Sequence, residues 1–311
     1  MSLARSIIKR YYKLRLSKSK WHIISTLPQL KIKRSLNGSQ SIYYKGKWVA
    51  QTRPLPELKK LATEECFIIA TGPSIKTTDL SLLKEQSLYG VNGSATLCKK
   101  HEINFSLYTV IDPSFVKYKI DLIKQVIDSG TRCLFNYKVI KAICDHDPKI
   151  LQGGKIYLVE EMNQAYHSNQ LPADKFYFHT QHHPYIYLHP DKRPKETRVG
   201  FSKDVELGIF DGGTVTYWAL QVAYYIGFKR IYILGMDLGG DRFYDTKDIA
   251  LPSYLDDDYE KYIKPAFETA KLALDNDENV EVFNLAMNSR LPDSIIQKKP
   301  YDEVIAALNP T

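Results

Sequence analysis

The chain has 311 residues, of which 44% are hydrophobic and 25% charged, a composition typical of a globular protein with one large α/β domain or two small ones. It has no apolar run of the ~18 residues that span a bilayer, and we expect no signal peptide because no uninterrupted apolar core follows the first charges. The four cysteines form no CxxC pair, which argues against a structural zinc site and favours reduced core thiols in a cytosolic protein.

Basic residues are concentrated near the N-terminus. The whole chain has 43 Lys and Arg against 35 Asp and Glu, a net charge of +8. Residues 1–60 hold 15 of these basic residues and a single acid, Glu57, so the remaining residues carry a net charge of −6. This asymmetry predicts an anionic partner for the N-terminal arm, not for the body.

The start of this arm has the periodicity of an amphipathic helix. The apolar residues of one face are Leu3, Ile7, Tyr11 and Leu14, and basic residues fall on the opposite face. Because such a helix suits an anionic membrane surface, we expect residues 1–60 to be a membrane-associating extension and expect no nucleic acid partner. The alternatives are RNA binding through stacked aromatic residues, a helix packed on the domain, and an organellar targeting peptide.

The arm continues into a short β-rich segment with a glycine turn at residues 41–51, and Pro54 and Pro56 mark a boundary. Strands and helices then alternate. The expected strands are 66–70, 87–93, 107–112 and 131–137, and the expected helices are 79–86 and 119–128. Such alternation indicates a parallel sheet with helices on both faces.

Residues 145–200 interrupt this alternation with many histidines, prolines and tyrosines, and we expect a lid or acceptor-binding insertion there. Regular elements return as a helix at 214–228, a strand at 229–238, a helix at 265–276 and a strand at 279–286. Residues 61–311 are therefore predicted to form one doubly wound, mostly parallel, Rossmann-like α/β domain.

Ligands of such sheets lie outside the carboxyl ends of the strands, so the residues that close the predicted strands are candidates. The turn at Thr71-Gly72-Pro73-Ser74 is neither a Walker loop nor a GxGxxG motif. Gly72 permits a close backbone approach, and free N–H groups at a helix start suit a phosphate. The other strand ends carry Asn92-Gly93, Asp112-Pro113, Gly235 to Asp237, and Asn288-Ser289.

Several of these segments, taken together, resemble known enzymes. The segments are GPSIKTTDL (72–80), VNGS (91–94), IDP (111–113), GTVTYWALQVAYYIGFKRIYILGMDL (213–238) followed by DRFYD, and Asn288-Ser289. They resemble the bacterial lipooligosaccharide sialyltransferases. The resemblance is closer to the lipopolysaccharide-core Kdo transferases, which share the VNGS-like turn, a GFSKD segment (200–204 here), an IQVAY-like helix and a GLDL…RFYD segment.

The resemblance implies a GT-A-like fold, a CMP-activated 2-keto acid sugar as the donor, and no metal ion or other cofactor. CMP-Kdo is the implied donor, and a lipid-linked core oligosaccharide is the implied acceptor. The residues that it places at the donor are Thr71, Gly72, Pro73, Ser74, Asn92, Gly93, Asp112, Thr214, Thr216 and Gly235.

The same resemblance, combined with charge arguments, suggests the chemical roles. Tyr244 is the expected donor of a hydrogen bond to the departing CMP, with Arg242 as its charged helper, although FYD could equally be a folded loop and Arg242 a surface charge. In the GFSKD segment, Lys203 would pair with the sugar carboxylate and Asp204 would act as the base, unless the pair forms a surface turn.

The histidine that serves as the base in the sialyltransferases has no counterpart in SYLDDDYEKYIKP (253–265). Asp112 and Asp237 are therefore further candidates for the base, and Asp237 also fits a ribose or base ligand. The segment HTQHHPYIYLHP (179–190) lacks metal-binding spacing such as HExxH. It is expected either as a lid that brings His182 near the chemistry or as a packed loop.

We therefore expect a glycosyltransferase that moves Kdo from CMP-Kdo to a lipid A-core oligosaccharide in lipopolysaccharide synthesis, held at the inner face of the bacterial inner membrane. Three alternatives remain. The first is a sialyltransferase that uses CMP-sialic acid. The second is a pterin diphosphotransferase, which would need ATP and Mg²⁺, and the third is a nucleotide-binding protein without catalysis.

Overall fold

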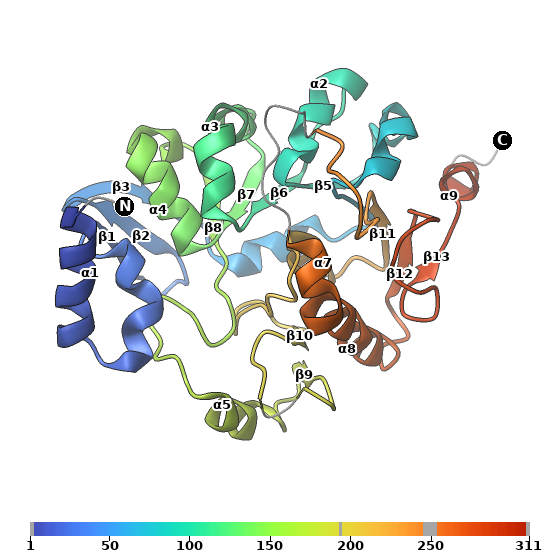
Figure 1. Ribbon diagram of the computed structural model, residues 1–311. Coiled ribbons are helices and arrows are strands. Elements are labelled where there is room, and N and C mark those ends of the chain that lie inside the picture. Colours follow the sequence, from blue (N-terminus) through green and yellow to red (C-terminus); the bar gives the residue numbers. More distant parts are fainter. Residues whose placement is uncertain (1–2, 193–194, 245–253, 309–311) are drawn as a thin grey trace.

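The structure is a computed structural model that describes residues 3–192, 195–244 and 254–308 (Figure 1). Its centre is an eight-stranded parallel sheet with the strand order β13-β12-β11-β4-β5-β6-β7-β8. The strands are β4 (Glu65–Ile69), β5 (Leu88–Val91), β6 (Leu107–Val110), β7 (Arg132–Phe135), β8 (Lys155–Leu158), β11 (Arg230–Leu234), β12 (Glu281–Asn284) and β13 (Gln297–Lys298). The prediction of a doubly wound, mostly parallel α/β sheet is confirmed, and the GT-A-like classification stays a prediction.

The central strands are apolar because both of their faces are buried. In β4, Phe67 and Ile69 point into one core, whereas Cys66 and Ile68 point into the other, as the two-residue period of a strand requires. The first core is completed by α3 (Pro113–Asp128) and α4 (Tyr137–His146), and the second by α6 (Val215–Ile226) and α8 (Lys264–Leu274). Figure 1 shows α3 and α4 on one side of the sheet and α8 on the other.

The connections near the centre of the sheet are short. The segment after β4 forms two 3-10 helices, η3 (Pro73–Thr77) and η4 (Leu80–Leu83), and the segment after β5 forms η5 (Asn92–Thr96) and α2 (Leu97–His101). Asp79 caps η4 by accepting from the Ser81 amide, but Thr78 before it is extended. The predicted helix at 79–86 is therefore reduced to a single short turn.

Of the residues before β4, those from 23 to 58 contribute buried side chains to the body, and those from 6 to 15 are mostly exposed. The residues before β4 form α1 (Leu3–Arg15), η1 (Lys18–Thr26), the antiparallel sheet β1 (Leu30–Arg34), β2 (Gln40–Tyr44) and β3 (Lys47–Gln51), and η2 (Leu55–Leu61). The expected glycine turn joins β2 to β3, with Gly46 at a φ of 80°. Ile32, Ile42 and Val49 belong to the same core as α3 and α4, and the Arg53 amide donates to the carbonyl of Ile156 in β8.

The expected lid begins later than residue 145. Residues 155–158 form β8, an edge strand of the main sheet, so that part of the prediction is wrong. The run Lys155–Leu158 is mostly buried and pairs with β7. It was not predicted as a strand because it is short and its flanking residues show no strand pattern. The rest of the segment contains η6 (Pro148–Leu151), α5 (Ala173–Thr180), and the antiparallel pair β9 (Ile186–Leu188) and β10 (Gly200–Ser202).

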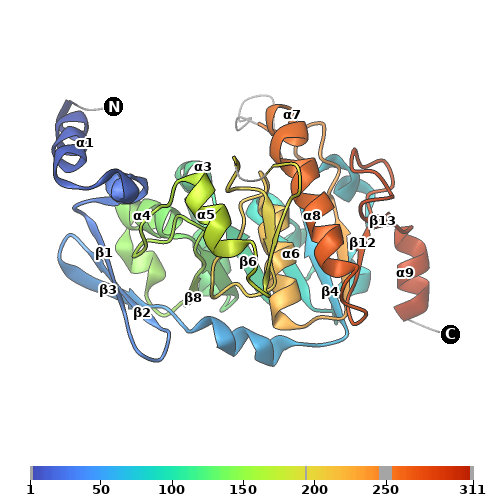
Figure 2. The same ribbon diagram turned by 90° about the horizontal axis from the view of Figure 1, so that it is seen from below.

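The C-terminal part completes the sheet. After β11 come α7 (Leu255–Asp258), the π-helix η7 (Tyr259–Ile263) and α8, and α9 (Tyr301–Leu308) follows β13. Figures 1 and 2 both show α1 and α9 at opposite ends of the sheet. The chain leaves β4 toward β5 and leaves β11 toward β12, in opposite directions from two adjacent strands. The gap between the carboxyl ends of β4 and β11 is therefore the topological switch point of the sheet.

Candidate functional site

A cleft of about 980 Å³, including its open mouth, lies at this switch point. Its walls come from the turns after β4, β5, β6 and β11 and from the start of α6. Eight of the residues predicted from the sequence line it together: Thr71, Gly72, Asn92, Asp112, Thr214, Thr216, Gly235 and Arg242. The residues predicted from the rule that ligands of parallel sheets lie at the strand ends thus line one continuous cavity.

The turns after β4 and β11 fit directly against each other. The Gly72 amide donates to the Gly235 carbonyl at 2.8 Å, and Gly235 has a left-handed φ of 68°. The amide and hydroxyl of Ser74 both donate to Oδ2 of Asp237, at 3.2 and 2.8 Å. Asp237 therefore holds the turn that Pro73 and Ser74 open, and none of these three residues is part of the cleft lining.

Asn92 forms an unusual part of the wall. Its backbone is left-handed, with a φ of 46°, and Tyr108 donates to its carbonyl at 2.5 Å. Its side-chain oxygen Oδ1 is buried and has no hydrogen-bond partner among the described residues. A buried acceptor without a partner costs free energy, which makes this amide a candidate to accept from a donor group of a ligand.

Tyr244 lies behind the adjacent Gly93. A Cβ atom on Gly93 would lie only 2.1 Å from Cε1 of Tyr244, so the ring occupies the space that a side chain would need. The ring also makes edge contacts with Phe115 and Phe243. The structure thus places Tyr244 beside the Asn92-Gly93 wall, close to the cleft.

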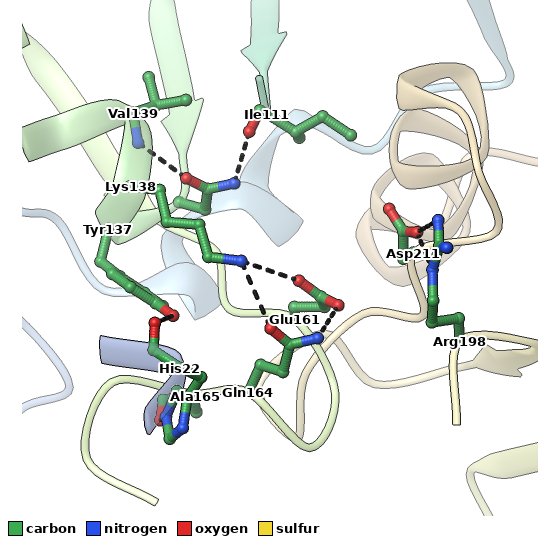
Figure 3. A network of polar contacts seen from close by, with 11 residues as sticks. His22, Ile111, Tyr137, Lys138, Val139, Glu161, Gln164, Ala165, Arg198 and Asp211 are labelled. Atoms are coloured by element: carbon green, nitrogen blue, oxygen red, sulfur yellow. Dashed lines mark hydrogen bonds and ion pairs between the residues drawn. The ribbon is translucent and has the colours of Figure 1, made fainter. Parts of the chain in front are cut away.

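Sequence reasoning missed the charged pair on the opposite wall. Arg198 donates from Nε to Oδ2 of Asp211 at 2.7 Å (Figure 3). Its Nη2 is 4.0 Å from Oδ2 of Asp258, and its guanidinium lies 3.8 Å from the ring centre of Tyr262. Burial opposes its charge, but Asp211, Asp258 and Tyr262 outweigh burial and raise the pKa of Arg198. The Asp211-Gly212-Gly213 turn before α6 was the available sequence signal.

Two predicted residues lie elsewhere. Lys203 and Asp204 line a separate pocket together with Gly227 and Lys229, which precede β11 at the amino edge of the sheet. Lys203 faces Asp277 at 3.9 Å, and Asp204 accepts from the Glu206 amide in its own turn. The expectation that this pair acts at the donor is therefore wrong, and the surface-turn alternative describes Asp204 correctly.

The histidine segment does not reach the cleft either. His182 is exposed in the turn between α5 and β9 and is not part of the cleft lining. His189 is buried, and its Nε2 lies 3.1 Å from Oε2 of Glu268 in α8. His182 therefore lies away from the cleft lining, whereas His189 is packed against α8.

Asp112 and Thr214 line the cleft and also cap helices. Asp112 caps α3 by accepting from the Ser114 amide at 2.7 Å, and Thr214 caps α6 through the Thr216 amide at 3.4 Å. Both caps keep a helix start at the cleft wall.

No helix of the described residues is long and apolar enough to cross a membrane.

Comparisons with known proteins found a family model and relatives that match this chain. A family model described as 3-deoxy-D-manno-octulosonic acid (Kdo) transferase WaaZ matches residues 50–301. The chain is 26% identical over 241 residues to a probable 3-deoxy-manno-octulosonic acid transferase of Salmonella typhimurium, covering 77% of this chain and 88% of the relative. A protein of the same description from Escherichia coli is 26% identical over 242 residues, with 75% and 82% covered.

Among solved structures, the MAf glycosyltransferase from Magnetospirillum magneticum AMB-1 aligns with a TM-score of 0.47 and 12% identity, over 78% of this chain but only 34% of the longer chain. The family model covers most of the sequence, including every turn that lines the cleft. The chain therefore belongs to the WaaZ family of 3-deoxy-D-manno-octulosonic acid transferases, which are glycosyltransferases.

Proposed function

We propose that the protein transfers Kdo from CMP-Kdo to a lipid-linked core oligosaccharide during lipopolysaccharide synthesis. The observation that carries this proposal is the cleft at the switch point, which gathers strand-end residues that the resemblance to CMP-sugar enzymes assigns to the donor. Membership of the Kdo transferase family supports Kdo as the sugar that is transferred. No resident cofactor enters the proposal, because the CMP-sugar is itself the activated substrate.

The nucleotide would lie along the turns after β4 and β5. Gly72 and Asn92 line the cleft there, and the unpaired Oδ1 of Asn92 would accept from an amino or hydroxyl group of the cytidine. Thr214 and Thr216 stand at the start of α6, where backbone N–H groups favour a phosphate.

The departing CMP would be stabilised from the Arg242 side. Arg242 lines the cleft, and Tyr244 lies beside the wall at Gly93. As the bond between the anomeric carbon and the phosphate oxygen breaks, negative charge accumulates on CMP. A phenol and a guanidinium held near that oxygen lower the free energy of the transition state.

The charges of the lining favour a CMP-sugar over ATP. Among the described residues, two arginines line the cleft together with Asp112, Asp211, Asp241 and Asp258. A phosphodiester and a sugar carboxylate carry one negative charge each, whereas a triphosphate would bring more charge against these carboxylates. The absent GK[ST] sequence also supports a CMP-sugar over ATP as the substrate.

The N-terminal helix would hold the protein at the inner face of the inner membrane, where a lipid-linked acceptor lies. In α1, Ile7 is 61% exposed and Leu14 84% exposed, and Tyr11 and Ile8 are also exposed beside basic residues. Exposed apolar side chains flanked by Lys and Arg fit the interface of an anionic membrane.

The test combines ligand binding and product analysis. CMP should raise the melting temperature of the protein, whereas ATP with Mg²⁺ should not. CMP-Kdo should label a truncated core acceptor, and CMP-sialic acid should not. A melting response to ATP alone, or transfer of sialic acid in place of Kdo, would overturn the proposal.

A further inference from the structure

Three of the four carboxylates that line the cleft are already engaged, and the fourth, Asp241, is exposed. Asp112 caps α3, and Asp211 and Asp258 face Arg198. Asp237 holds Ser74, and Asp204 lies at the other edge of the sheet. Inverting transfer to a hydroxyl group needs a group that accepts its proton, so a further carboxylate near the cleft is of interest.

Glu161 is such a group: it is not among the residues that line the cleft, but its backbone is bridged to the segment that leads into the lining residue Asp211. It follows β8, whose carboxyl end lies at the same edge of the sheet as the cleft. The Ile209 amide donates to the Glu160 carbonyl at 2.9 Å, and the Met162 amide donates to the Ile209 carbonyl at 2.7 Å. This bridge fixes Glu161 beside Ile209, two residues before Asp211 in the cleft lining.

The side chain of Glu161 is held on one side, and the Arg198–Asp211 pair lies on its other side (Figure 3). Gln164 donates from Nε2 to Oε1 of Glu161 at 2.5 Å, and Nζ of Lys138 lies 3.6 Å from Oε2. Lys138 also donates to Oε1 of Gln164 at 3.3 Å. Figure 3 shows Glu161 between this pair and the Arg198–Asp211 pair.

The neighbouring wall is fixed by Asn136 at the end of β7. Its Nδ2 donates to the carbonyl of Ile111, a cleft residue, and its Oδ1 accepts from the Val139 amide, both at 2.8 Å. The same helix start carries Lys138. The group that holds Glu161 and the wall of the cleft therefore belong to one rigid corner of the fold.

We propose that Glu161 is the general base of the transfer reaction, an assignment that rests on the proposed function. An oxygen of the Glu161 carboxylate takes the proton of the acceptor hydroxyl group. The acceptor oxygen forms the bond to the anomeric carbon of Kdo, and the bond from that carbon to the phosphate oxygen breaks. CMP leaves with the electron pair, so charge and atoms balance.

The electrostatic setting suits this role. Burial raises the pKa of Glu161, Lys138 lowers it, Asp211 raises it and Arg198 lowers it again, with a net result of about 7. Tyr137 is the other titratable group that interacts with it. A base whose pKa lies near the working pH combines a useful ionised fraction with a strong affinity for the proton.

Glu160, the adjacent carboxylate, has a structural role in the same turn. It is paired with Arg34, and its Oε1 accepts from the Tyr166 amide at 2.6 Å. The side chain of Glu161 is 15% exposed, against 9% for Glu160, and its polar partners among the described residues are Gln164 and Lys138. A side chain with this partial exposure keeps a face available to an acceptor.

The test is the pH profile of Kdo transfer, measured on the full chain with CMP-Kdo and a truncated core acceptor. The wild-type rate should fall as the pH drops through about 7, because the base becomes protonated. Glu161→Gln should lower kcat by about 100-fold to 10,000-fold and abolish this acidic limb, while CMP still raises the melting temperature as in the wild type. Glu161→Asp should retain the limb at a reduced rate.

Lys138→Met provides an independent readout. Removing this cation should raise the pKa of Glu161 and move the acidic limb to higher pH, because Lys138 lowers that pKa. Asp204→Asn is the matched control, a carboxylate lost from the other edge of the sheet, and should leave the profile unchanged. Wild-type kcat in Glu161→Gln, or an unmoved limb in Lys138→Met, overturns the assignment, whereas a wild-type protein that transfers no Kdo overturns the proposed function itself.

Discussion

The ring of Tyr244 fills the space beside Gly93, where an added Cβ atom would lie 2.1 Å from Cε1 of the ring. The only side chain that leaves this space free is the hydrogen of glycine. The contact joins the turn after β5 to the segment after β11, two of the turns that line the cleft. Gly93 therefore sets the position of the phenol that we assign to the departing CMP.

Gly93→Ala should displace the ring of Tyr244 and lower kcat by about 10-fold or more, since a misplaced catalytic group loses much of its effect. Tyr244→Phe should cause a loss of similar size while keeping the packing against Phe115 and Phe243. Steady-state kinetics on both variants measures this. Full activity in Tyr244→Phe would remove the phenol from the mechanism.

Gly72→Ala should destabilise the fold as well as the site. A Cβ atom there would lie 2.1 Å from Oδ2 of Asp237 and 2.6 Å from the Gly235 carbonyl, and the second of these is backbone that moves only with its strand. Overpacking of this kind costs about 1–3 kcal/mol. Urea unfolding should show a lower midpoint, and an unchanged midpoint would mean that the two turns are less tightly coupled than the structure indicates.

Asn92→Ala should weaken CMP binding with little effect on stability. The buried Oδ1 has no partner to lose among the described residues, but a ligand would supply one. The dissociation constant for CMP should rise by about 10-fold, equivalent to about 1.4 kcal/mol. Calorimetric titration with CMP tests this, and wild-type affinity would place the nucleotide elsewhere.

Lys203→Ala should retain near wild-type transfer and CMP affinity. Its ammonium group faces Asp277 and the rings of Tyr187 and Tyr224 at the amino edge of the sheet, far from the strand ends that form the cleft. An initial-rate assay at varied CMP-Kdo concentration is the measurement. A large rise in KM would restore Lys203 to the donor site.

Ile7→Glu combined with Leu14→Glu should abolish binding to anionic liposomes without changing transfer to a water-soluble acceptor. Both side chains are exposed on α1, so the substitutions leave the core intact. Flotation of the full chain with liposomes that contain anionic lipid is the assay. Equal flotation of the variant and the wild type would contradict a membrane role for this helix.

The sequence allowed good prediction of the parallel strands and their ends. Short apolar runs closed by turn residues are a local signal, and a parallel sheet brings all such ends to one edge. This is why Thr71, Asn92, Asp112 and Gly235 could be named before their proximity was known.

Lys203 and Asp204 were misplaced for a different reason. They follow β10, which pairs with β9 outside the main sheet, so the strand-end rule does not apply to them. A shared GFSKD segment says nothing about which edge of the sheet it lies on.

Glu161 was missed because its environment is built by tertiary contacts. The strand before it is only four residues long, and Lys138, Gln164 and Arg198 come from three separate segments. A single sequence without structure carries no local pattern that joins them. Burial and charge at such a site become visible only when the chain is folded.

The central claim is transfer of Kdo from CMP-Kdo, and one measurement tests it most directly. The purified full-length protein is incubated with CMP-Kdo and a truncated lipid A-core acceptor, and the products are analysed by mass spectrometry. We predict an acceptor heavier by one Kdo residue together with an equal amount of released CMP. An unmodified acceptor with intact CMP-Kdo, under conditions in which CMP binds the protein, would contradict the proposed function.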